Sequence, residues 1–158
     1  MTITGEGHER TLILVKPDGV SRGLVGEIVS RFERHGFVIE AIASRHMTPD
    51  MVREHYAHLI DRPFFHEITS YMTSGPVIAI VMQAPNAVEV ARQIVGATDP
   101  AQAAPGTIRG DLATSIRHNL VHASDSKEAA AAEIGRFFLG SSEITTENGT
   151  RASDGFVQ

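Results

Sequence analysis

The chain has 158 residues, 42% of them hydrophobic and 21% charged, a balance that predicts one soluble globular domain with its own core. Cysteine is absent, which excludes disulfides and thiolate metal sites and suits a reducing cytoplasm. The net charge of −5 argues against tight non-specific binding to nucleic acid, but it leaves room for a local basic pocket that binds a single anionic ligand. No apolar run reaches the roughly 20 residues of a membrane span, and the polar segment Met1–Arg10 does not resemble a signal peptide. We therefore expect a cytoplasmic protein without membrane contact.

The first part of the chain predicts a strand followed by a helix. The apolar run 10–15 predicts a buried strand, and residues 16–19 (KPDG) carry a turn signal. Apolar residues then recur with helical spacing over 24–34, which predicts an amphipathic helix. Gly36 is well placed to end this helix in the left-handed conformation.

The middle of the chain predicts two strands separated by helices. Residues 37–44 (FVIEAIAS) predict the second strand. Thr48, followed by Pro49, predicts the start of a helix that continues to Tyr56. A further helix is predicted over about 61–72, and residues 77–82 (VIAIVM) predict the third strand.

The last third combines regular elements with a long irregular segment. Asn86, with Glu89 three residues later, predicts a capping box for a helix through Val95. Residues 96–110 are rich in Gly and Pro, and a loop of this length in a compact domain is commonly functional. Residues 119–123 predict a fourth strand, and 124–126 (SDS) cap a helix that reaches 138.

The alternation of strands and helices predicts an α/β or α+β sandwich, but it does not select the topology. The composition divides the chain into an N-terminal extension (1–9), one folded domain (10–139) and a polar tail (140–158). The tail is rich in Ser, Thr, Gly and Glu and cannot bury enough apolar surface to fold alone.

Eight histidines are present, and His122 has the most suggestive context. It follows an apolar strand and precedes a helix start, where backbone N–H groups and the helix dipole favour anions. His8, His35, His46, His55, His58, His66 and His118 lie in polar or helix-end contexts that predict solvated surface side chains. His118 and His122 have no supporting carboxylate pattern, so the sequence does not favour a zinc site.

Three cations are candidates for binding an anion near His122. Lys16 ends the first strand, Arg92 lies on the polar face of a helix, and Arg109 lies in the long loop, where Gly106 and Gly110 allow close backbone approach. Each of these residues alone is more often a surface charge than a ligand, so only their combination favours an anion site. The chain has neither a GxxxxGK[ST] loop nor a GxGxxG motif, so neither of these phosphate-binding motifs applies.

The segment 119–126 (NLVHASDS) resembles the signature of the nucleoside diphosphate kinase family, with the phosphorylated histidine at His122. Ala123 stands where the family commonly has glycine, a change between small residues. Five further blocks match the family at near-constant spacing: 16–19 (KPDG) with 22–24 (RGL), 55–56 (HY), 62–65 (RPFF), 74–77 (SGPV) and 105–111 (PGTIRGD). The likeness extends over about 10–138.

The resemblance implies a ferredoxin-like βαββαβ sandwich with a four-stranded antiparallel sheet. It also implies a ping-pong reaction that moves the γ-phosphate of a nucleoside triphosphate, usually ATP, to a nucleoside diphosphate through phosphorylated His122. Mg²⁺ is expected to bridge the nucleotide's phosphates, without side-chain ligands from the protein. Broad specificity for base and sugar is expected, because stacking barely distinguishes one base from another.

Roles follow by position from the same resemblance. His122 corresponds to the nucleophile and Glu133 to the carboxylate that hydrogen-bonds its other ring nitrogen. Phe64 and Ile116 correspond to the residues on the two sides of the base. The remaining matched positions surround the phosphates and the ribose, with Lys16 and Tyr56 closest to the reaction: Lys16, Tyr56, Arg92, Thr98, Arg109 and Asn119.

Two other functions compete with this interpretation. A catalytically silent relative is disfavoured because all the catalytic positions are filled. A nucleic-acid-binding ferredoxin-like domain is disfavoured because the chain is acidic, has two tyrosines and lacks tryptophan. The family also implies a homo-oligomer built from a common dimer, for which we favour a hexamer over a tetramer.

Overall fold

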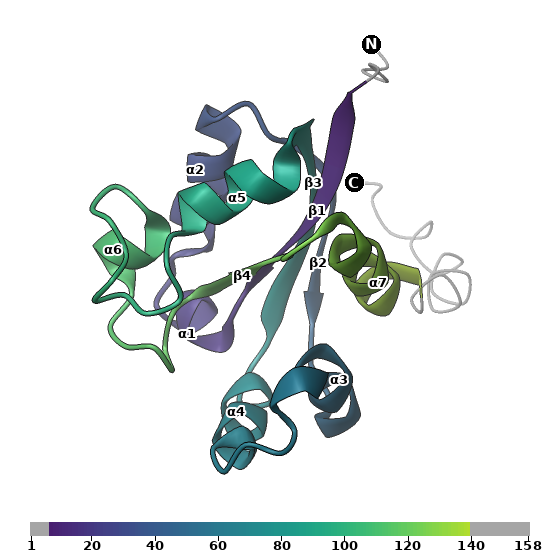
Figure 1. Ribbon diagram of the computed structural model, residues 1–158, viewed down its shortest axis with the longest axis vertical. Helices are drawn as coiled ribbons and strands as arrows, with labels where there is room; N and C mark the ends of the chain where they lie inside the picture. The colour runs from purple at the N-terminus through teal and green to yellow at the C-terminus, as the bar shows by residue number, and fades with distance from the viewer. Residues whose placement is uncertain (1–6, 140–158) are drawn as a thin grey trace, which may run out of the picture.

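The computed structural model describes residues 7–139, which form a four-stranded antiparallel sheet with helices on both faces (Figure 1). The strands are β1 (His8–Val15), β2 (Val38–Arg45), β3 (Val77–Pro85) and β4 (Val121–Ala123), in the order β2-β3-β1-β4. The predicted tail 140–158 and residues 1–6 of the predicted extension lie outside the described residues. The proposed division at residues 9 and 139 stays a prediction.

The helices that connect the strands differ in length and position. They are α1 (Pro17–Ser21), α2 (Val25–Arg34), α3 (Pro49–His55), a 3₁₀ turn η1 (Ala57–Leu59), α4 (Phe65–Met72), α5 (Ala87–Val95), α6 (Ile108–Leu112) and α7 (Lys127–Phe138). The order β1-α2-β2-β3-α5-β4 is the expected βαββαβ arrangement, so the predicted ferredoxin-like fold is confirmed. None of the described helices combines the length and apolar character needed to cross a bilayer.

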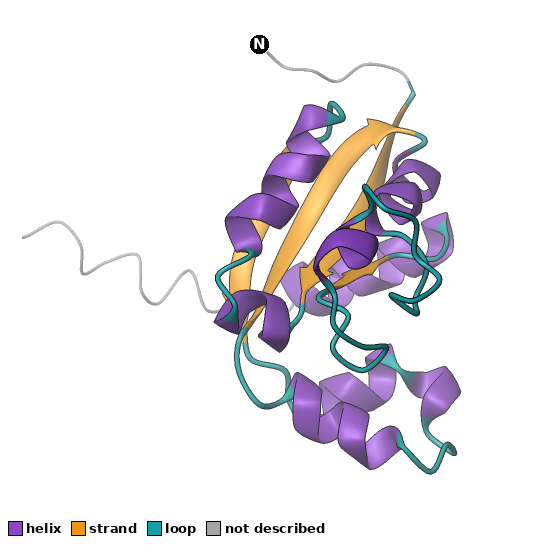
Figure 2. Ribbon diagram, turned by 90° about the vertical axis from the view of Figure 1, so that its left-hand side faces the viewer, coloured by secondary structure: helices purple, strands orange, loops and turns teal. Residues whose placement is uncertain are grey.

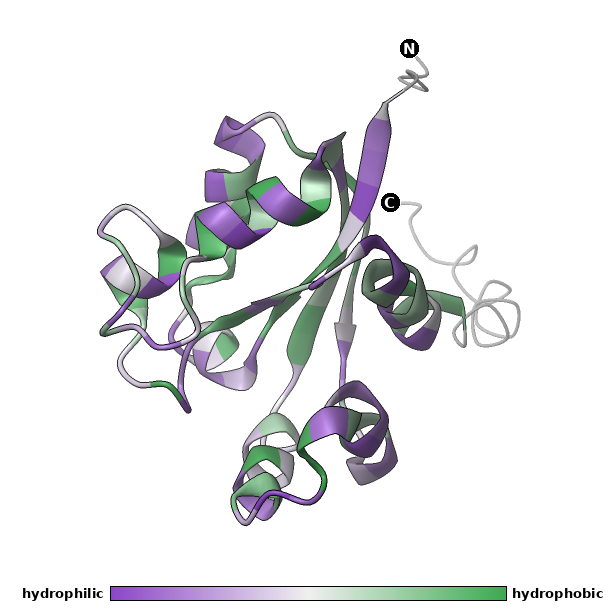
Figure 3. Cartoon of the chain, viewed as in Figure 1, coloured by the Kyte–Doolittle hydropathy of each residue, from purple (hydrophilic) through white to green (hydrophobic). Residues whose placement is uncertain are grey.

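The two central strands are buried on both faces and divide the core into two layers. On β1, Ile13 and Val15 face one layer while Leu12 and Leu14 face the other, as the two-residue period of a strand requires. Helices α2 and α5 cover the first layer, and α3, α4 and α7 lie against the second (Figures 1 and 2). The hydropathy colouring shows the same division, with apolar central strands and helices that are polar on their outer sides (Figure 3).

Several local signals work as the sequence predicts. Thr48 accepts a hydrogen bond from Met51 N at the start of α3, and Ser126 accepts one from Ala129 N at the start of α7. Gly36 has φ +83° after α2, which is the left-handed conformation that ends a helix.

Four local predictions are wrong. The predicted turn at 16–19 is largely the short helix α1, because Pro17 suits a first helical position. The helix predicted from residue 61 begins at Phe65, two residues after Pro63. The irregular segment 96–110 already contains the start of α6, which Thr107 caps through Gly110 N. Apart from these wrong predictions, the 3₁₀ turn η1 is an element that the sequence does not predict.

The fourth wrong prediction is the capping box at Asn86. Asn86 has φ +50° and makes no side-chain cap, so the Asn86–Glu89 pairing is wrong. Glu9 on β1 caps α5 instead. Its Oε1 accepts a hydrogen bond from Val88 N at 2.8 Å. A carboxylate at this end of α5 also complements the helix dipole.

Candidate active site

Two adjoining cavities open beside the edge of the sheet that carries β4. The larger, of about 950 Å³, lies between α4 and the segment before β4, and the smaller, of about 510 Å³, lies between α3, α5 and α7. Both are lined by Lys16, Tyr56, Thr98 and Asn119, so they form one continuous cleft. The two ends differ in character, and each suits a different part of an elongated ligand.

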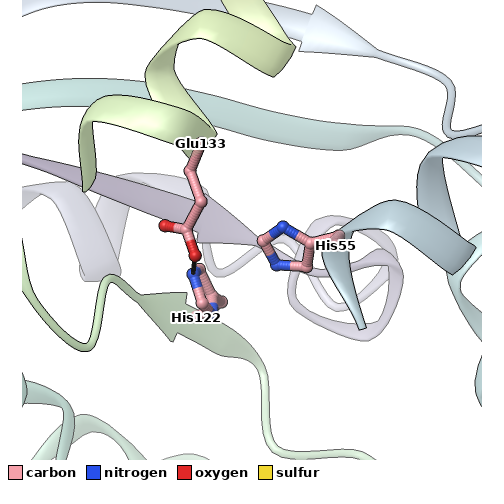
Figure 4. Close-up of side chains that lie close together, drawn as sticks. All are labelled: His55, His122 and Glu133. Carbon is pink, nitrogen blue, oxygen red and sulfur yellow. Dashed lines mark hydrogen bonds and ion pairs between the residues drawn. The ribbon is translucent and has the colours of Figure 1, made fainter. Parts of the chain in front are cut away.

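The smaller cavity brings His122 and Glu133 together. His122 projects from β4 toward Glu133 on α7, and its Nε2 lies 3.0 Å from Glu133 Oε1 (Figure 4). An ionised carboxylate only accepts hydrogen bonds, so Nε2 carries the proton and Nδ1 keeps its lone pair. Glu133 is only 8% exposed, and Ser124 Oγ donates to its second oxygen at 2.6 Å. Both carboxylate oxygens are therefore engaged, which fixes the orientation of the His122 ring.

Ser124 connects this pair to the centre of the sheet. Its Oγ accepts a hydrogen bond from the backbone N–H of Leu12 at 3.1 Å, and the side chain is fully buried. The sequence predicted only a capping role for the segment 124–126. Ser124 stands two residues after His122, and in extended backbone two such side chains point to the same side. This spacing is the signal that points to a role beside the histidine.

His55 also lies in this cavity, so its prediction as a solvated surface histidine is wrong. Its side chain is 9% exposed, and its ring packs edge-to-face against His122 with the ring centroids 4.5 Å apart. Ligand atoms of His55, His122 and Glu133 lie within 4.8 Å of one another, the closest approach to a metal cluster among the described residues. His118 packs edge-to-face on Tyr71, with the ring centroids 4.9 Å apart.

Four cations line the smaller cavity, three of them predicted: Lys16, Arg92, Arg109 and Arg136. Arg109 is buried and donates to the backbone carbonyls of Asn119, Gly96 and Val121 at 3.3, 3.1 and 2.7 Å. This uses three of its five N–H donors and leaves two for a ligand. Burial and the nearby Arg92 lower the pKa of Arg109 to about 10, which still leaves it charged at neutral pH.

Lys16 lies where the two cavities meet. Its Nζ donates to Asn119 Oδ1 at 2.7 Å, and Asn119 Nδ2 donates to the carbonyl of Thr98 at 3.1 Å. Burial, followed by the charge of Arg109, lowers the pKa of Lys16 to about 7. The amine form of Lys16 is therefore available to take up a proton when an anion binds.

The segment that leads into β4 is held in an unusual conformation. Leu120 has φ +71°, which is rare for an apolar residue. Its backbone is held on both sides, since its carbonyl accepts from Lys16 N at 2.8 Å and its N–H donates to Asp18 Oδ2 at 3.2 Å. Strained backbone of this kind gathers at functional sites, and here it positions Asn119 and His122 on either side.

The long loop is fixed by contacts from α2. Arg31 Nη1 donates to Asp111 Oδ2 at 2.7 Å and to the carbonyls of Gly106 and Thr107 at 3.3 Å. At Gly110 the backbone packs closely against another part of the same loop. A Cβ at this position would lie 2.1 Å from the carbonyl oxygen of Ala104. The sequence predicts that this glycine lets the backbone approach a ligand closely. Its observed effect is to compact the loop that carries Arg109.

The larger cavity is mainly apolar and aromatic. Phe64 and Ile116 line its walls, and Ile116 is 55% exposed. The guanidinium of Arg117 lies 5.2 Å from the centroid of the Phe64 ring and pairs with Glu67 on α4. Tyr56 lies at the junction, where its hydroxyl contacts Met72 Sδ at 3.7 Å and burial raises its pKa. This end therefore offers flat apolar surfaces to a ligand, while the smaller cavity offers cations.

Sequence comparison with known proteins agrees with the function that this geometry suggests. The sequence model of the nucleoside diphosphate kinase family matches residues 9–143. The chain belongs to the nucleoside diphosphate kinase family. It is 54% identical over 132 residues to a nucleoside diphosphate kinase of Frankia casuarinae, which covers 84% of this chain and 96% of that protein. It is 52% identical to nucleoside diphosphate kinase 3 of Homo sapiens, over 83% of this chain and 78% of that protein. The chain is thus a phosphotransferase of this family.

Solved structures of the family share the fold. A nucleoside diphosphate kinase from Aquifex aeolicus is similar with a TM-score of 0.79 and 42% identity, covering 83% of this chain and 95% of that one. A halophilic nucleoside diphosphate kinase from Halobacterium salinarum, solved in complex with CDP, is similar with a TM-score of 0.80 and 46% identity. That match covers 82% of this chain and 87% of the halophilic one.

The structure brings all ten predicted site residues to the lining of the two cavities. Lys16, Tyr56, Thr98 and Asn119 line both; Phe64 and Ile116 line the larger; Arg92, Arg109, His122 and Glu133 line the smaller. Sequence reasoning missed His55, Ser124 and Arg136. Arg136 lies three residues after Glu133 on α7, a spacing that places both on one helix face and is the signal by which it could be found.

Proposed function

We propose that this nucleoside diphosphate kinase carries the phosphate on Nδ1 of His122. The observation that carries the proposal is the hydrogen bond from His122 Nε2 to Glu133, because it leaves Nδ1 as the free lone pair. His122 lines a cavity together with four cations, which suits the terminal phosphate of a nucleotide. Glu133 would stabilise the positive charge that the ring acquires when Nδ1 forms its bond to phosphorus.

The reaction proceeds in two half-steps of the same chemistry. Nδ1 attacks the γ-phosphorus of a nucleoside triphosphate, usually ATP, while the bond to the β–γ bridging oxygen breaks and the nucleoside diphosphate leaves. A second nucleoside diphosphate then attacks the phosphohistidine with a terminal phosphate oxygen, and the P–N bond breaks. Arg92 and Arg109 would stabilise charge on the transferring oxygens, where positioning and electrostatics supply most of the rate.

The larger cavity would hold the base and the sugar. Phe64 and Ile116 offer stacking and apolar contact, which every base can satisfy, so we expect broad base specificity. Lys16 and Asn119, at the junction of the cavities, are placed for sugar hydroxyls and phosphates. A nucleotide bound in this way would extend from Phe64 at one end to His122 at the other.

Mg²⁺ would enter with the nucleotide. Mg²⁺ prefers oxygen ligands, yet the carboxylates of the smaller cavity have other partners. Asp125 pairs with Arg92, Glu54 with Arg136, and Glu133 binds His122 and Ser124. The residues therefore fit a metal held by the nucleotide's phosphates rather than by a protein cage. Such an ion would neutralise phosphate charge, and the residues of this chain would orient the phosphates around it.

Self-association is proposed through β2. This strand pairs with β3 on one side and with no other strand among residues 7–139. Its exposed residues include Val38 and Ile42, 45% and 52% exposed, and an apolar edge strand is a ready site for pairing. We propose a dimer through this edge and, from it, a hexamer rather than a tetramer. Light scattering with and without the residues after Leu139 measures the assembly, and Ile42→Lys is expected to lower the mass.

We propose that the enzyme works in the cytoplasm, where nucleotides are abundant and a chain without cysteine needs no oxidising compartment. Steady-state kinetics with ATP and dTDP test the activity. Parallel lines in double-reciprocal plots are expected, because each half-step ends before the next nucleotide binds. Intersecting lines would indicate a ternary complex and contradict the phosphohistidine route.

A further inference from the structure

His55 touches the proposed nucleophile but has no part in the mechanism above. It ends α3, packs edge-to-face against the His122 ring and is nearly buried. A second imidazole in this place is a potential competitor, because its lone pair could accept the proton of His122 or attack the phosphorus, and its N–H could bind the carboxylate that orients His122. The structure contains a contact that prevents this competition.

Arg136 provides that contact. Its Nη1 lies 3.0 Å from His55 Nδ1, and its Nε lies 3.5 Å from Glu54 Oε1 on the exposed side. Arginine only donates hydrogen bonds, so Nδ1 of His55 must be the acceptor. The ring proton therefore lies on Nε2, which is buried and has no hydrogen-bond partner among the described residues.

The surroundings keep His55 neutral. Burial is the main cause that lowers its pKa to about 2, with further contributions from His122, Arg136, Lys16 and His58. Glu133 lies nearby, yet both its oxygens bind His122 and Ser124. A neutral His55 with its lone pair occupied can neither take the proton of His122 nor act as a second nucleophile.

We propose that Arg136 is a positioning residue that masks the lone pair of His55, so that, of the two imidazoles in contact, only His122 keeps a free lone pair, at Nδ1. The inference rests on the proposed function of His122. Without Arg136, Nδ1 of His55 is a buried acceptor in need of a donor. The His122 ring packed against it carries a donor, Nε2–H. If this N–H turned to His55, its bond to Glu133 would weaken and the nucleophile would lose its fixed orientation.

The first test observes the ring nitrogens of the wild-type protein directly. Imidazole ¹⁵N spectra of the full chain, assigned with His55→Asn, report which ring nitrogen is protonated. The proposal expects a neutral His55 with the proton on Nε2 from pH 6 to 8. A proton on Nδ1, or a charged ring in that range, would overturn it.

The second test is a set of variants. Arg136→Met is expected to lower kcat by about tenfold, the cost of leaving one buried acceptor without its donor, with KM nearly unchanged. Its His55 spectrum is expected to show exchange between tautomers. Arg136→Lys keeps a donor and is expected to restore both readouts. Arg53→Met, the same change at an exposed position of α3, serves as the control.

The outcomes separate the two proposals. If wild-type protein is not labelled at His122 by γ-labelled ATP, the proposed function fails while the His55 spectrum still stands. If His122 is labelled but Arg136→Met keeps wild-type kcat, the masking role is overturned. Equal losses in Arg136→Met and Arg136→Lys with an unchanged His55 spectrum would also overturn it, because they indicate packing alone.

Discussion

Glu133 Oε1 lies 3.0 Å from Nε2 of His122, on the side of the ring opposite the proposed nucleophilic nitrogen. The contact joins α7 to β4 and sets both the tautomer and the direction of the ring. It also places a negative charge where the ring would become positive in the proposed phosphoryl transfer. The role of His122 thus depends on a residue 11 positions later in the chain.

Replacing the carboxylate while keeping its shape tests this role. Glu133→Gln is expected to lower kcat by roughly 10²-fold, because the amide neither fixes the tautomer nor balances the ring's charge. Nucleotide KM is expected to change little, since Glu133 does not touch the nucleotide. Steady-state kinetics measure both constants. Glu128→Gln on the exposed face of α7 is the control, and equal activity of the two variants would refute the orienting role.

Ser124→Ala tests the buried link from Glu133 to β1. The change leaves Leu12 N–H and one Glu133 oxygen without their partner, so we expect the free energy of unfolding to fall by about 1–3 kcal/mol. A decrease in kcat should accompany the loss. Ser126→Ala removes only a helix cap and is expected to cost about 1 kcal/mol without loss of kcat. Urea unfolding and kinetics on both variants separate stability from function.

The lowered pKa of Lys16 predicts that nucleotide binding takes up a proton. With a pKa of about 7 in the free protein, Lys16 is mostly neutral at pH 8. A bound phosphate favours the charged form and raises the pKa, so binding at pH 8 should take up about one proton. At pH 6 the uptake should vanish, because Lys16 is already charged. Calorimetry in buffers of different ionisation enthalpy measures this number, and Lys16→Arg should abolish it.

The compact loop around Arg109 depends on Gly110. A Cβ at this position would lie 2.1 Å from Ala104 O, so Gly110→Ala must displace the loop. We expect a stability loss of about 1–3 kcal/mol and a fall in kcat/KM as Arg109 moves. Gly26→Ala, on an exposed helix position with no atom within 4 Å, is the control and should be neutral or slightly stabilising. Equal thermal unfolding of the two variants would contradict the packing argument.

The sequence predicts elements well where the cause is local. Helix α2 is predicted from the spacing of Val25, Ile28, Val29 and Phe32, because that periodicity alone defines its buried face. The order of the strands in the sheet has no such local cause. Strand β1 lies between β3 and β4, which are far along the chain, and no local pattern encodes this pairing. Only the resemblance to the family supplied the topology.

The difference between local and distant causes also explains the wrong predictions at His55 and Asn86. His55 looks like a surface histidine because its neighbours in the chain are polar, but α7 and β4 bury it. Asn86 has the right chemistry for a capping box, yet its backbone is left-handed. Glu9 caps α5 instead, by accepting from the N–H of Val88, 79 positions later in the chain. In both cases a partner distant in the sequence decides the outcome.

The most direct test of the phosphohistidine on His122 is the position of the phosphate itself. Full-length protein is incubated with γ-labelled ATP without an acceptor, and the acid-labile, base-stable label is located by peptide mapping and by an isomer-specific phosphohistidine assay. The account predicts one label per chain on Nδ1 of His122, absent in His122→Ala and retained in His118→Ala. Label on Nε2, on another residue, or at an undiminished level in His122→Ala would contradict it.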